Sequence, residues 1–320
     1  MKILIYGAGV IGSIFAAKLS FLGQDVTILA RGKRLEEIQN NGIVLCNPKS
    51  AGKEIARIRV IDHLSPEERF DYIFVVMQRT QVNSVLESLA RNGSENIVFV
   101  VNTAAGYEEW KRAIGAERLL IGFPSAGGER INGMVRYFVG RGLMRAFQTT
   151  TFGEVNGKKS QRVWELIRMF RRAGIPSVYC SDMDAWQKSH VAMVTCIANA
   201  LYGHRCDNRR LAASRRGVRS MVLGIKEGFA VLEKLDIRVT PRKLAIWRLP
   251  TGILTAAFKV IMGTQLAEIT MAKHCIAARM EMVDLQEEFD QLIRKSGLET
   301  PYIDLLRKNL NEHKSADARR

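Results

Sequence analysis

Six residues near the start of the chain limit its possible folds more than any other feature. Gly7-Ala8-Gly9-Val10-Ile11-Gly12 has the spacing G-x-G-x-x-G. It follows the apolar run Lys2–Tyr6, which is typical of a β-strand, and it opens the helical pattern Ile11–Leu22. In that context the glycines permit a tight turn, so that a pyrophosphate can bind at the helix N-terminus. A turn without a ligand is the alternative, but the context favours dinucleotide binding.

The first half of the chain alternates between two kinds of segment. Short runs rich in Ile, Val, Leu and Phe predict strands, and helical patterns separate them. This alternation indicates βαβ units and therefore a parallel sheet that is covered on both faces. The predicted strands are Lys2–Tyr6, Asp25–Ala30, Tyr72–Met77, Asn96–Asn102, Arg118–Phe123 and Ser177–Tyr179, and the predicted helices are Ile11–Leu22, Arg34–Asn40, Gln81–Arg91, Glu108–Ile114 and Ser160–Ala173.

A different rhythm follows the alternating region. The runs Met134–Val139, Met144–Gln148 and Thr151–Val155 are joined by turns that contain glycine. Because no helical pattern separates them, we expect an antiparallel addition at one edge of the sheet.

From Asp182 onward the patterns are nearly all helical. Asp182 or Asp184 suits the N-cap of a helix that contains Trp186–Tyr202, and Gly297 suits a C-cap. Further helices are predicted over Arg215–Leu235, Gln265–Ser296 and Tyr302–Asn311. The fold class is therefore α/β: a Rossmann-type domain over residues 1–180, an all-α domain over 181–311 and a frayed tail over 312–320. The domain boundary is expected near residues 178–183.

Composition excludes several classes of protein. With 47% hydrophobic and 25% charged residues, the 320-residue chain is globular rather than disordered. The first residues lead directly into a strand without a signal-peptide pattern, and Arg248, Pro250 and Lys259 interrupt the most apolar later stretch. The five cysteines are scattered and form no C-x-x-C pair, which argues against a disulfide framework or a metal site. We expect a soluble cytoplasmic protein that neither spans nor binds a membrane.

The net charge of +16 is strongly basic. Its densest cluster consists of Arg205, Arg209, Arg210, Arg215, Arg216 and Arg219. Such a cluster can bind nucleic acid or an acidic surface. No aromatic residues lie between the arginines for base stacking, so we favour a solvated face and do not expect a nucleic-acid partner.

The end of the second predicted strand bears on cofactor choice. An NAD site usually places Asp or Glu there to bind the ribose diol. This chain has Ala30-Arg31-Gly32-Lys33-Arg34 instead, a basic cluster that suits a 2′-phosphate. A solvated basic loop is the alternative, but the chemistry favours NADP over NAD.

Two ionisable residues in the helical half are candidates for catalysis. Lys188 lies in the first turns of an apolar helix and can act as a proton donor if its ammonium group lies in a cleft. Taken alone, such a lysine is more often a surface charge whose stem covers apolar residues. Glu281 is equally ambiguous, because glutamate is an ordinary helix residue.

Taken together, several segments resemble the ketopantoate reductase (2-dehydropantoate 2-reductase) family. They are MKILIYGAGVIGS at the N-terminus, LARGKRLEEIQNNGI after the second strand, Asn102 after NIVFVV, WQKSHV at the start of the helical half, and ARMEMVDL and SGLETP near the end. The resemblance runs over most of the chain. It implies a two-domain enzyme that passes a hydride from NADPH to the ketone carbon of a 2-keto acid, in a cleft between the domains.

The resemblance also implies residue roles. Gly7, Ala8, Gly9, Val10, Ile11 and Gly12 would hold the pyrophosphate. Arg31 would bind the 2′-phosphate, and Gln78, Asn102 and Ala126 would also contact the cofactor. Lys188 would be the general acid that protonates the developing alkoxide, with Asn102 near the substrate. Glu281 would help to orient cofactor and substrate.

The substrate half departs from the family pattern. Gln78 and then Arg79 stand where the family usually has a lysine, and Ala192 replaces an asparagine one turn after Lys188. The nearest polar substitutes for substrate binding are Thr195 and Thr270, the latter beside Ile269 at the place of a family serine.

A pocket that lacks polar partners rejects a substrate that needs them. We therefore expect an NADPH-dependent reductase of ketopantoate or of another 2-keto acid. The alternative is a non-catalytic NADP-binding sensor or scaffold that has lost its substrate site. The apolar helical half is also compatible with a homodimer.

Overall fold

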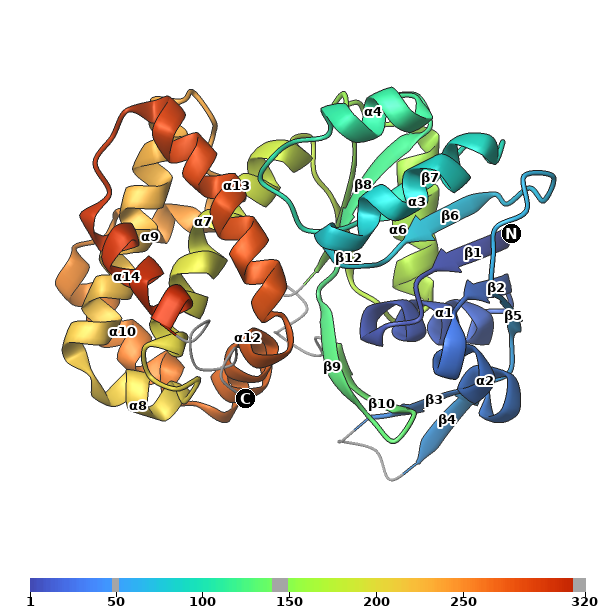
Figure 1. The fold of residues 1–320 in the computed structure, drawn as a ribbon, viewed down its shortest axis with the longest axis horizontal. Helices are drawn as coiled ribbons and strands as arrows, with labels where there is room; N and C mark the ends of the chain where they lie inside the picture. The colour runs from blue at the N-terminus through green and yellow to red at the C-terminus, as the bar shows by residue number, and fades with distance from the viewer. Residues whose placement is uncertain (48–51, 140–148, 313–320) are drawn as a thin grey trace. The chain divides into compact units, whose positions relative to one another are not determined.

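The computed structural model describes residues 1–47, 52–139 and 149–312. Contacts between Cα atoms divide the chain into two compact units. Unit 1 comprises Met1–Asn102 and Tyr107–Met183, and unit 2 comprises the short loop Thr103–Gly106 and the chain from Asp184 onward. Figure 1 shows unit 1 as a sheet with helices and unit 2 as a bundle of helices.

Unit 1 is built on an eight-stranded sheet. Its strands, in spatial order, are β12 (Ser177–Tyr179), β11 (Thr150–Glu154), β8 (Leu119–Phe123), β7 (Ile97–Val100), β6 (Tyr72–Val75), β1 (Lys2–Tyr6), β2 (Asp25–Leu29) and β5 (Arg59–Ile61). Neighbouring strands run parallel except β11 and β8, which are antiparallel. Strands β6 and β7 are buried along their whole length, which is typical of a parallel sheet with both faces covered.

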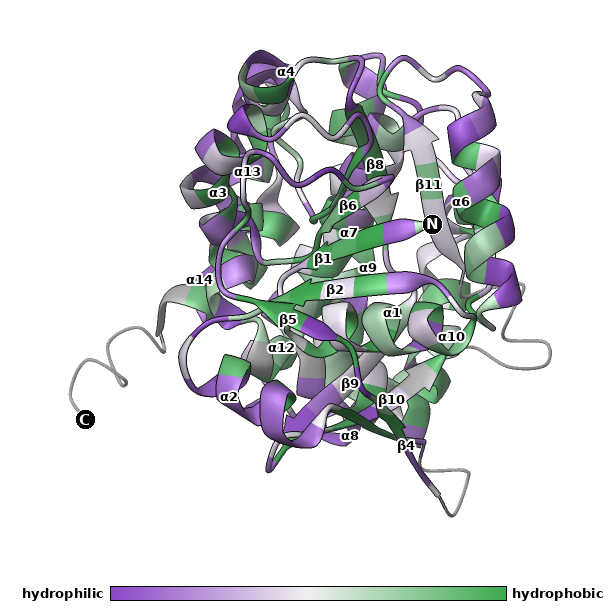
Figure 2. Ribbon diagram, turned by 90° about the vertical axis from the view of Figure 1, so that its right-hand side faces the viewer, coloured by the Kyte–Doolittle hydropathy of each residue, from purple (hydrophilic) through white to green (hydrophobic). Residues whose placement is uncertain are grey.

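Helices cover both faces of this sheet. They are α1 (Val10–Phe21), α2 (Gly32–Asn41), α3 (Arg79–Arg91), α4 (Glu108–Ile114) and α6 (Gln161–Arg172). On one face Phe170 of α6 lies 4.9 Å from Phe15 of α1, ring centre to ring centre, and both belong to one apolar core. On the other face Trp110 of α4 stacks on Phe99 of β7 at 4.5 Å. Figure 2 shows β1 and β2 mostly hydrophobic and α2 largely hydrophilic. The α/β class is confirmed.

A second, four-stranded sheet belongs to unit 1. Its order is β4 (Lys53–Ala56), β3 (Ile43–Cys46), β10 (Met134–Val139) and β9 (Ala126–Ile131). The prediction that Met134–Val139 joins the edge of the main sheet is therefore wrong, whereas an antiparallel strand over Thr151–Val155 is confirmed as β11. The predicted strand Met144–Gln148 lies outside the described residues.

The two-residue turn Asn132-Gly133, with φ of 49° and 79°, closes β9 onto β10 as a hairpin, because Asn-Gly tolerates positive φ at both positions.

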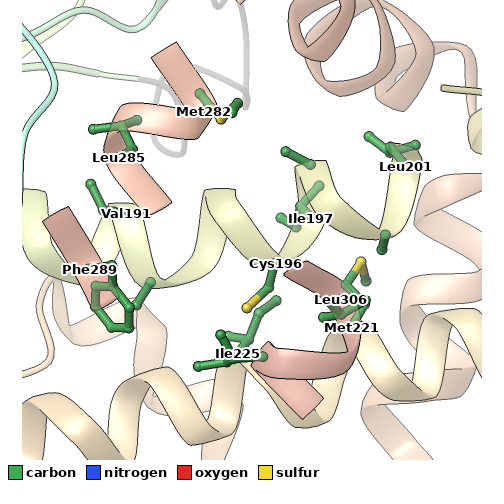
Figure 3. Packing of buried hydrophobic residues seen from close by; sticks show 14 of the residues in the cluster. Val191, Cys196, Ile197, Leu201, Met221, Ile225, Met282, Leu285, Phe289 and Leu306 are labelled. Carbon is green, nitrogen blue, oxygen red and sulfur yellow. The ribbon is translucent and has the colours of Figure 1, made fainter. Parts of the chain in front are cut away.

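Unit 2 is helical throughout the part that the structure describes. Its elements are α7 (Met183–Tyr202, starting one residue inside unit 1), α8 (Asn208–Ala213), α9 (Arg215–Lys234), η1 (Arg242–Arg248), α10 (Thr251–Met262), α11 (Gln265–Ala267), the π-helical η2 (Glu268–Ala272), α12 (Lys273–Ala277), α13 (Arg279–Ser296) and α14 (Pro301–Glu312). Figure 3 shows how side chains of four helices meet in the core, for example Val191 of α7, Ile225 of α9, Phe289 of α13 and Leu306 of α14.

The predicted single helix Gln265–Ser296 is wrong in its continuity. The π-helical turn η2 interrupts it, and Ala278, with φ −111° and ψ 26°, ends α12 before α13 begins. Gly297 adopts the left-handed conformation (φ 67°) after α13, which confirms the predicted C-cap. Helix α7 starts at Met183, so Asp182 stands at its N-cap position and Asp184 in its first turn.

Among the described residues, no single helix is long and apolar enough to cross a membrane. The bent pair η1 and α10, which meet at 118°, passes that test only when both helices are taken together.

Candidate cofactor-binding and catalytic residues

The glycine turn between β1 and α1 is shaped by close backbone approaches. Gly7 has φ +124°, and a Cβ on it would lie 2.2 Å from the carbonyl oxygen of Val76 at the end of β6. A Cβ on Gly12 would lie 1.9 Å from the Gly7 carbonyl oxygen. Only glycine therefore fits at these two positions.

The start of α1 offers room for an anion. Gly9 is its N-cap residue, and nothing lies within 4 Å of the place where a Cβ on Gly9 would be. Because Gly9 has no side chain, it cannot accept from the N–H groups of the first turn, and that turn contains no acidic residue. Ala8, Val10 and Ile11 pack partly against the core. The N-terminus of α1 therefore offers backbone N–H donors, the positive end of the helix dipole and open space, and these features fit a pyrophosphate.

The two arginines at the start of α2 have different roles. Arg31 is exposed at the N-cap of α2, where its Nη2 donates to the Tyr6 hydroxyl at 3.3 Å. Arg34 is only 10% exposed and donates to the Ala8 carbonyl oxygen (3.2 Å) and to Ser13 Oγ (3.0 Å). Arg34 therefore holds the glycine turn by hydrogen bonds, whereas Arg31 is the more exposed of the two guanidinium groups.

Gln78 and Arg79 follow β6 at the position where the family usually has a lysine. Gln78 is exposed at the N-cap of α3. The Arg79 guanidinium instead contacts Glu109 of α4 (3.1 Å) and Asn83 (3.1 Å). Ala126 begins β9, partly buried against the core that also packs α1.

Asn102 follows β7 at the carboxyl end of the strand. Its Oδ1 is buried and has no hydrogen-bond partner in the part of the chain that the structure describes. Leaving a buried acceptor unpaired costs about 1–3 kcal/mol, so this oxygen calls for a donor that the described residues do not supply. An Oδ1 in this position suits a donor from a bound ligand, such as a ribose hydroxyl.

Lys188 is held by an acidic partner on its own helix. Its Nζ lies 2.5 Å from Asp184 Oδ2, one turn earlier on α7. The Lys188 side chain is only 13% exposed, unlike that of a solvated surface lysine. Sequence reasoning treated Asp184 only as a cap, although the Asp-x-x-x-Lys spacing indicates an ion pair on one helix face.

Ala192 and Thr195, which follow Lys188 on α7, are both buried in the core of unit 2. Ala192 is fully buried and packs against α9 at Gly228, where an added Cβ would lie 3.1 Å from the Ala192 Cβ. Thr195 is 1% exposed, and its hydroxyl donates to the Val191 carbonyl oxygen at 2.8 Å. Its role in substrate binding stays a prediction.

The start of α13 and the preceding π-helix carry the remaining candidates. Burial, followed by the neighbouring Asp284 carboxylate, raises the pKa of Glu281 from 4.5 to about 7. In η2, the Thr270 hydroxyl donates to the Leu266 carbonyl oxygen at 2.8 Å, and Ile269 is 40% exposed. π-helical turns occur frequently at functional sites. Within the described ranges, no group of three or more His, Cys, Asp or Glu residues is arranged to hold a metal ion.

Sequence comparisons relate this chain to known proteins. Residues 3–157 match the family model "Ketopantoate reductase PanE/ApbA". The chain is 29% identical over 208 residues to 2-dehydropantoate 2-reductase of Mesorhizobium japonicum (59% of this chain, 63% of the relative) and 27% identical over 190 residues to that of Pyrococcus horikoshii (58% of each). In both matches the chain spans less than two thirds of the relative's length.

Solved structures match over nearly the whole chain. The 2-dehydropantoate 2-reductase of Geobacter metallireducens has a TM-score of 0.79 at 18% identity, over 98% of this chain and 99% of that one. A ternary structure of D-mandelate dehydrogenase with NADH and anilino(oxo)acetate has a TM-score of 0.79 at 16% identity, over 99% of both chains. At such identities these matches show the fold alone. Residues 3–157, just under half of the chain, are thus similar in sequence to the ketopantoate reductase family, and solved structures of that family share the fold over nearly the whole chain.

Proposed function

We propose that the protein is an NADPH-dependent reductase that converts ketopantoate or a related 2-keto acid to the 2-hydroxy acid. The observation that carries the proposal is the largely buried Lys188 side chain, whose ammonium group is paired with Asp184, because reduction of a ketone needs a proton source. The sequence similarity to ketopantoate reductases supports the oxidoreductase class, and structural neighbours solved with NADH support a nicotinamide cofactor.

The residues of unit 1 fit NADPH. The glycine turn and the start of α1 would hold the pyrophosphate, and Arg31 the 2′-phosphate. The unpaired Asn102 Oδ1 would accept from the nicotinamide ribose. When bound, NADPH supplies a hydride to the ketone carbon of the substrate.

Lys188 would complete the reduction. Its Nζ donates a proton to the ketone oxygen as that oxygen gains negative charge, so that hydride and proton together yield the hydroxyl group. A cation placed at this oxygen stabilises the transition state more than the ground state. Asp184 orients the ammonium group through its ion pair. With a pKa of about 7, Glu281 is partly protonated at neutral pH and can then donate a hydrogen bond to cofactor or substrate.

The proposed substrate is a 2-keto acid, and experiment must identify the group attached to its keto carbon. Ala192 lies in the core and Thr195 and Thr270 use their hydroxyls within their own helices, so these positions offer fewer polar partners than the family pattern. The structural neighbour D-mandelate dehydrogenase was solved with anilino(oxo)acetate, which carries an aromatic ring and an oxo group next to its carboxylate. This favours testing aromatic and branched 2-keto acids beside ketopantoate.

A second candidate function rests on the same three positions. If the substrate partners are lost altogether, the protein is a non-catalytic NADP-binding sensor or scaffold. It would then bind NADPH through the glycine turn and Arg31 without turnover.

The deciding experiment measures NADPH absorbance with purified protein and a panel of ketopantoate, pyruvate, branched and aromatic 2-keto acids. The reductase proposal expects steady oxidation of NADPH with at least one acid. Confirmed NADPH binding without turnover for any acid would refute it and favour the sensor.

We place this activity in the cytoplasm. All five cysteines are free, including the partly exposed Cys46, Cys180 and Cys206. Free thiols persist in the reducing cytoplasm, where glutathione keeps them reduced.

A further inference from the structure

The loop Thr103–Gly106, which directly follows Asn102, is held by a single carboxylate oxygen. Oε2 of Glu288, on α13, accepts hydrogen bonds from Thr103 Oγ1 (2.8 Å), the Ala104 amide (2.6 Å) and the Ala105 amide (3.2 Å). The Ala105 amide also donates to Thr103 Oγ1 at 3.1 Å. Three donors that converge on one charged acceptor fix the loop more tightly than neutral bonds would.

Both ends of this loop meet residues of the proposed reaction. At its start stands Asn102, whose Oδ1 is buried and unpaired among the described residues. At its end, Gly106 has φ +80°, and a Cβ on it would lie 3.6 Å from Asp184 Oδ1, the carboxylate that pairs with Lys188. Between them Ala104 is 1% exposed in the core of unit 2.

Helix α13 places Glu288 on the same face as Glu281. Seven residues separate the two, which is about two turns and roughly 10 Å along the axis. One helix therefore carries the glutamate with the raised pKa and the glutamate that holds the loop.

We infer that Glu288 is a positioning residue: its carboxylate orders Thr103–Gly106 and thereby sets Asn102 for the nicotinamide half of the cofactor. The inference rests on the proposed reductase function. Glu288 acts through the loop, so its loss lowers turnover without removing a group that contacts the reacting atoms.

Five variants separate positioning from general structure. Glu288→Ala removes the acceptor, and Glu288→Gln restores an uncharged one. Glu287→Ala is the matched control, because Glu287 is the exposed neighbour on the same helix. Asn102→Ala, alone and combined with Glu288→Ala, forms a double-mutant cycle.

The first measurement needs no substrate. Hydrogen exchange of the Ala104 and Ala105 amides is followed in the cofactor-free protein. Because bonds to a charged acceptor are strong, exchange should accelerate by about tenfold or more in Glu288→Ala and not in Glu287→Ala. Unchanged exchange would overturn the inference.

The second measurement is turnover with the best 2-keto acid. In Glu288→Ala, kcat should fall by about tenfold or more while KM stays within about twofold, with partial recovery in Glu288→Gln. In the Asn102→Ala background the same substitution should cost little further. Faster exchange with unchanged kcat, or fully additive losses, would show a merely structural role and overturn the inference.

If the reductase proposal itself is wrong, the wild-type protein will oxidise no NADPH, and this result is distinct from a failure of the positioning inference. In that case the fluorescence of bound NADPH reports the nicotinamide environment. A changed emission in Glu288→Ala, with the control unchanged, supports positioning through the loop, and identical emission overturns it.

Discussion

Glu281→Gln should change how stability depends on pH. Burial, followed by the Asp284 carboxylate, raises the pKa of Glu281 from 4.5 to about 7 in the folded protein. Below pH 4.5 the carboxyl group is protonated in both the folded and the unfolded state, so it has no effect. Between pH 4.5 and 7 only the unfolded state ionises, and the free energy of unfolding falls as the pH rises.

The magnitude follows from that interval. About 2.5 pH units at about 1.4 kcal/mol each give roughly 3 kcal/mol, the full cost above pH 7. Glutamine has nearly the same shape and no charge at any of these pH values. The variant should therefore gain about 3 kcal/mol over the wild type between pH 4.5 and pH 8.

Urea unfolding at pH values from 4 to 8, followed by circular dichroism, measures this difference. Glu287→Gln, at an exposed site of the same helix, controls for the loss of one carboxylate. A difference between Glu281→Gln and wild type that stays constant with pH would refute the reasoning that Glu281 is buried at the cost of its charge.

Three further substitutions test the remaining parts of the account. Arg31→Ala should reduce the preference for NADPH over NADH by about 10- to 100-fold in fluorescence titrations, and the exposed Lys33→Ala should not; equal losses would point to general charge. Gly12→Ala should abolish NADPH binding, because its Cβ would lie 1.9 Å from the Gly7 carbonyl oxygen; retained affinity would contradict the role of the turn. Ala192→Asn should destabilise the protein by about 2 kcal/mol or more in urea unfolding, because the position is fully buried in the core of unit 2; a stable variant with improved turnover would show a polar pocket instead.

The sequence predicted best where local patterns and packing agree. Strand β1 and helix α4 have the predicted bounds, because buried apolar runs and amphipathic spacing are local signals. Strand β9 was missed because its glycines and polar residues lack such a run, although the Asn132-Gly133 pair predicts a hairpin. The interruption of Gln265–Ser296 by a π-helical turn was missed because no proline or glycine marks it in the sequence.

The same distinction applies to the site. The glycine spacing identified the turn of unit 1, because the backbone itself demands glycine there. Arg34 donates a hydrogen bond to that turn, and Glu288 accepts hydrogen bonds from the loop after Asn102. Both interactions join residues far apart in the chain, so the periodicity of the sequence cannot reveal them. The ion pair of Lys188 with Asp184 could have been predicted from the sequence, because the two residues are one helical turn apart.

The most direct test of the account is the turnover of Lys188→Ala with NADPH and the best 2-keto acid, together with its affinity for NADPH. A general acid contributes about 10²- to 10⁴-fold to the rate, so kcat should fall by that factor. The dissociation constant of NADPH should stay within about twofold of the wild-type value, because the glycine turn and Arg31 lie in unit 1. Wild-type turnover in the variant, or equal losses of binding and rate, would contradict the role of Lys188 as the proton donor.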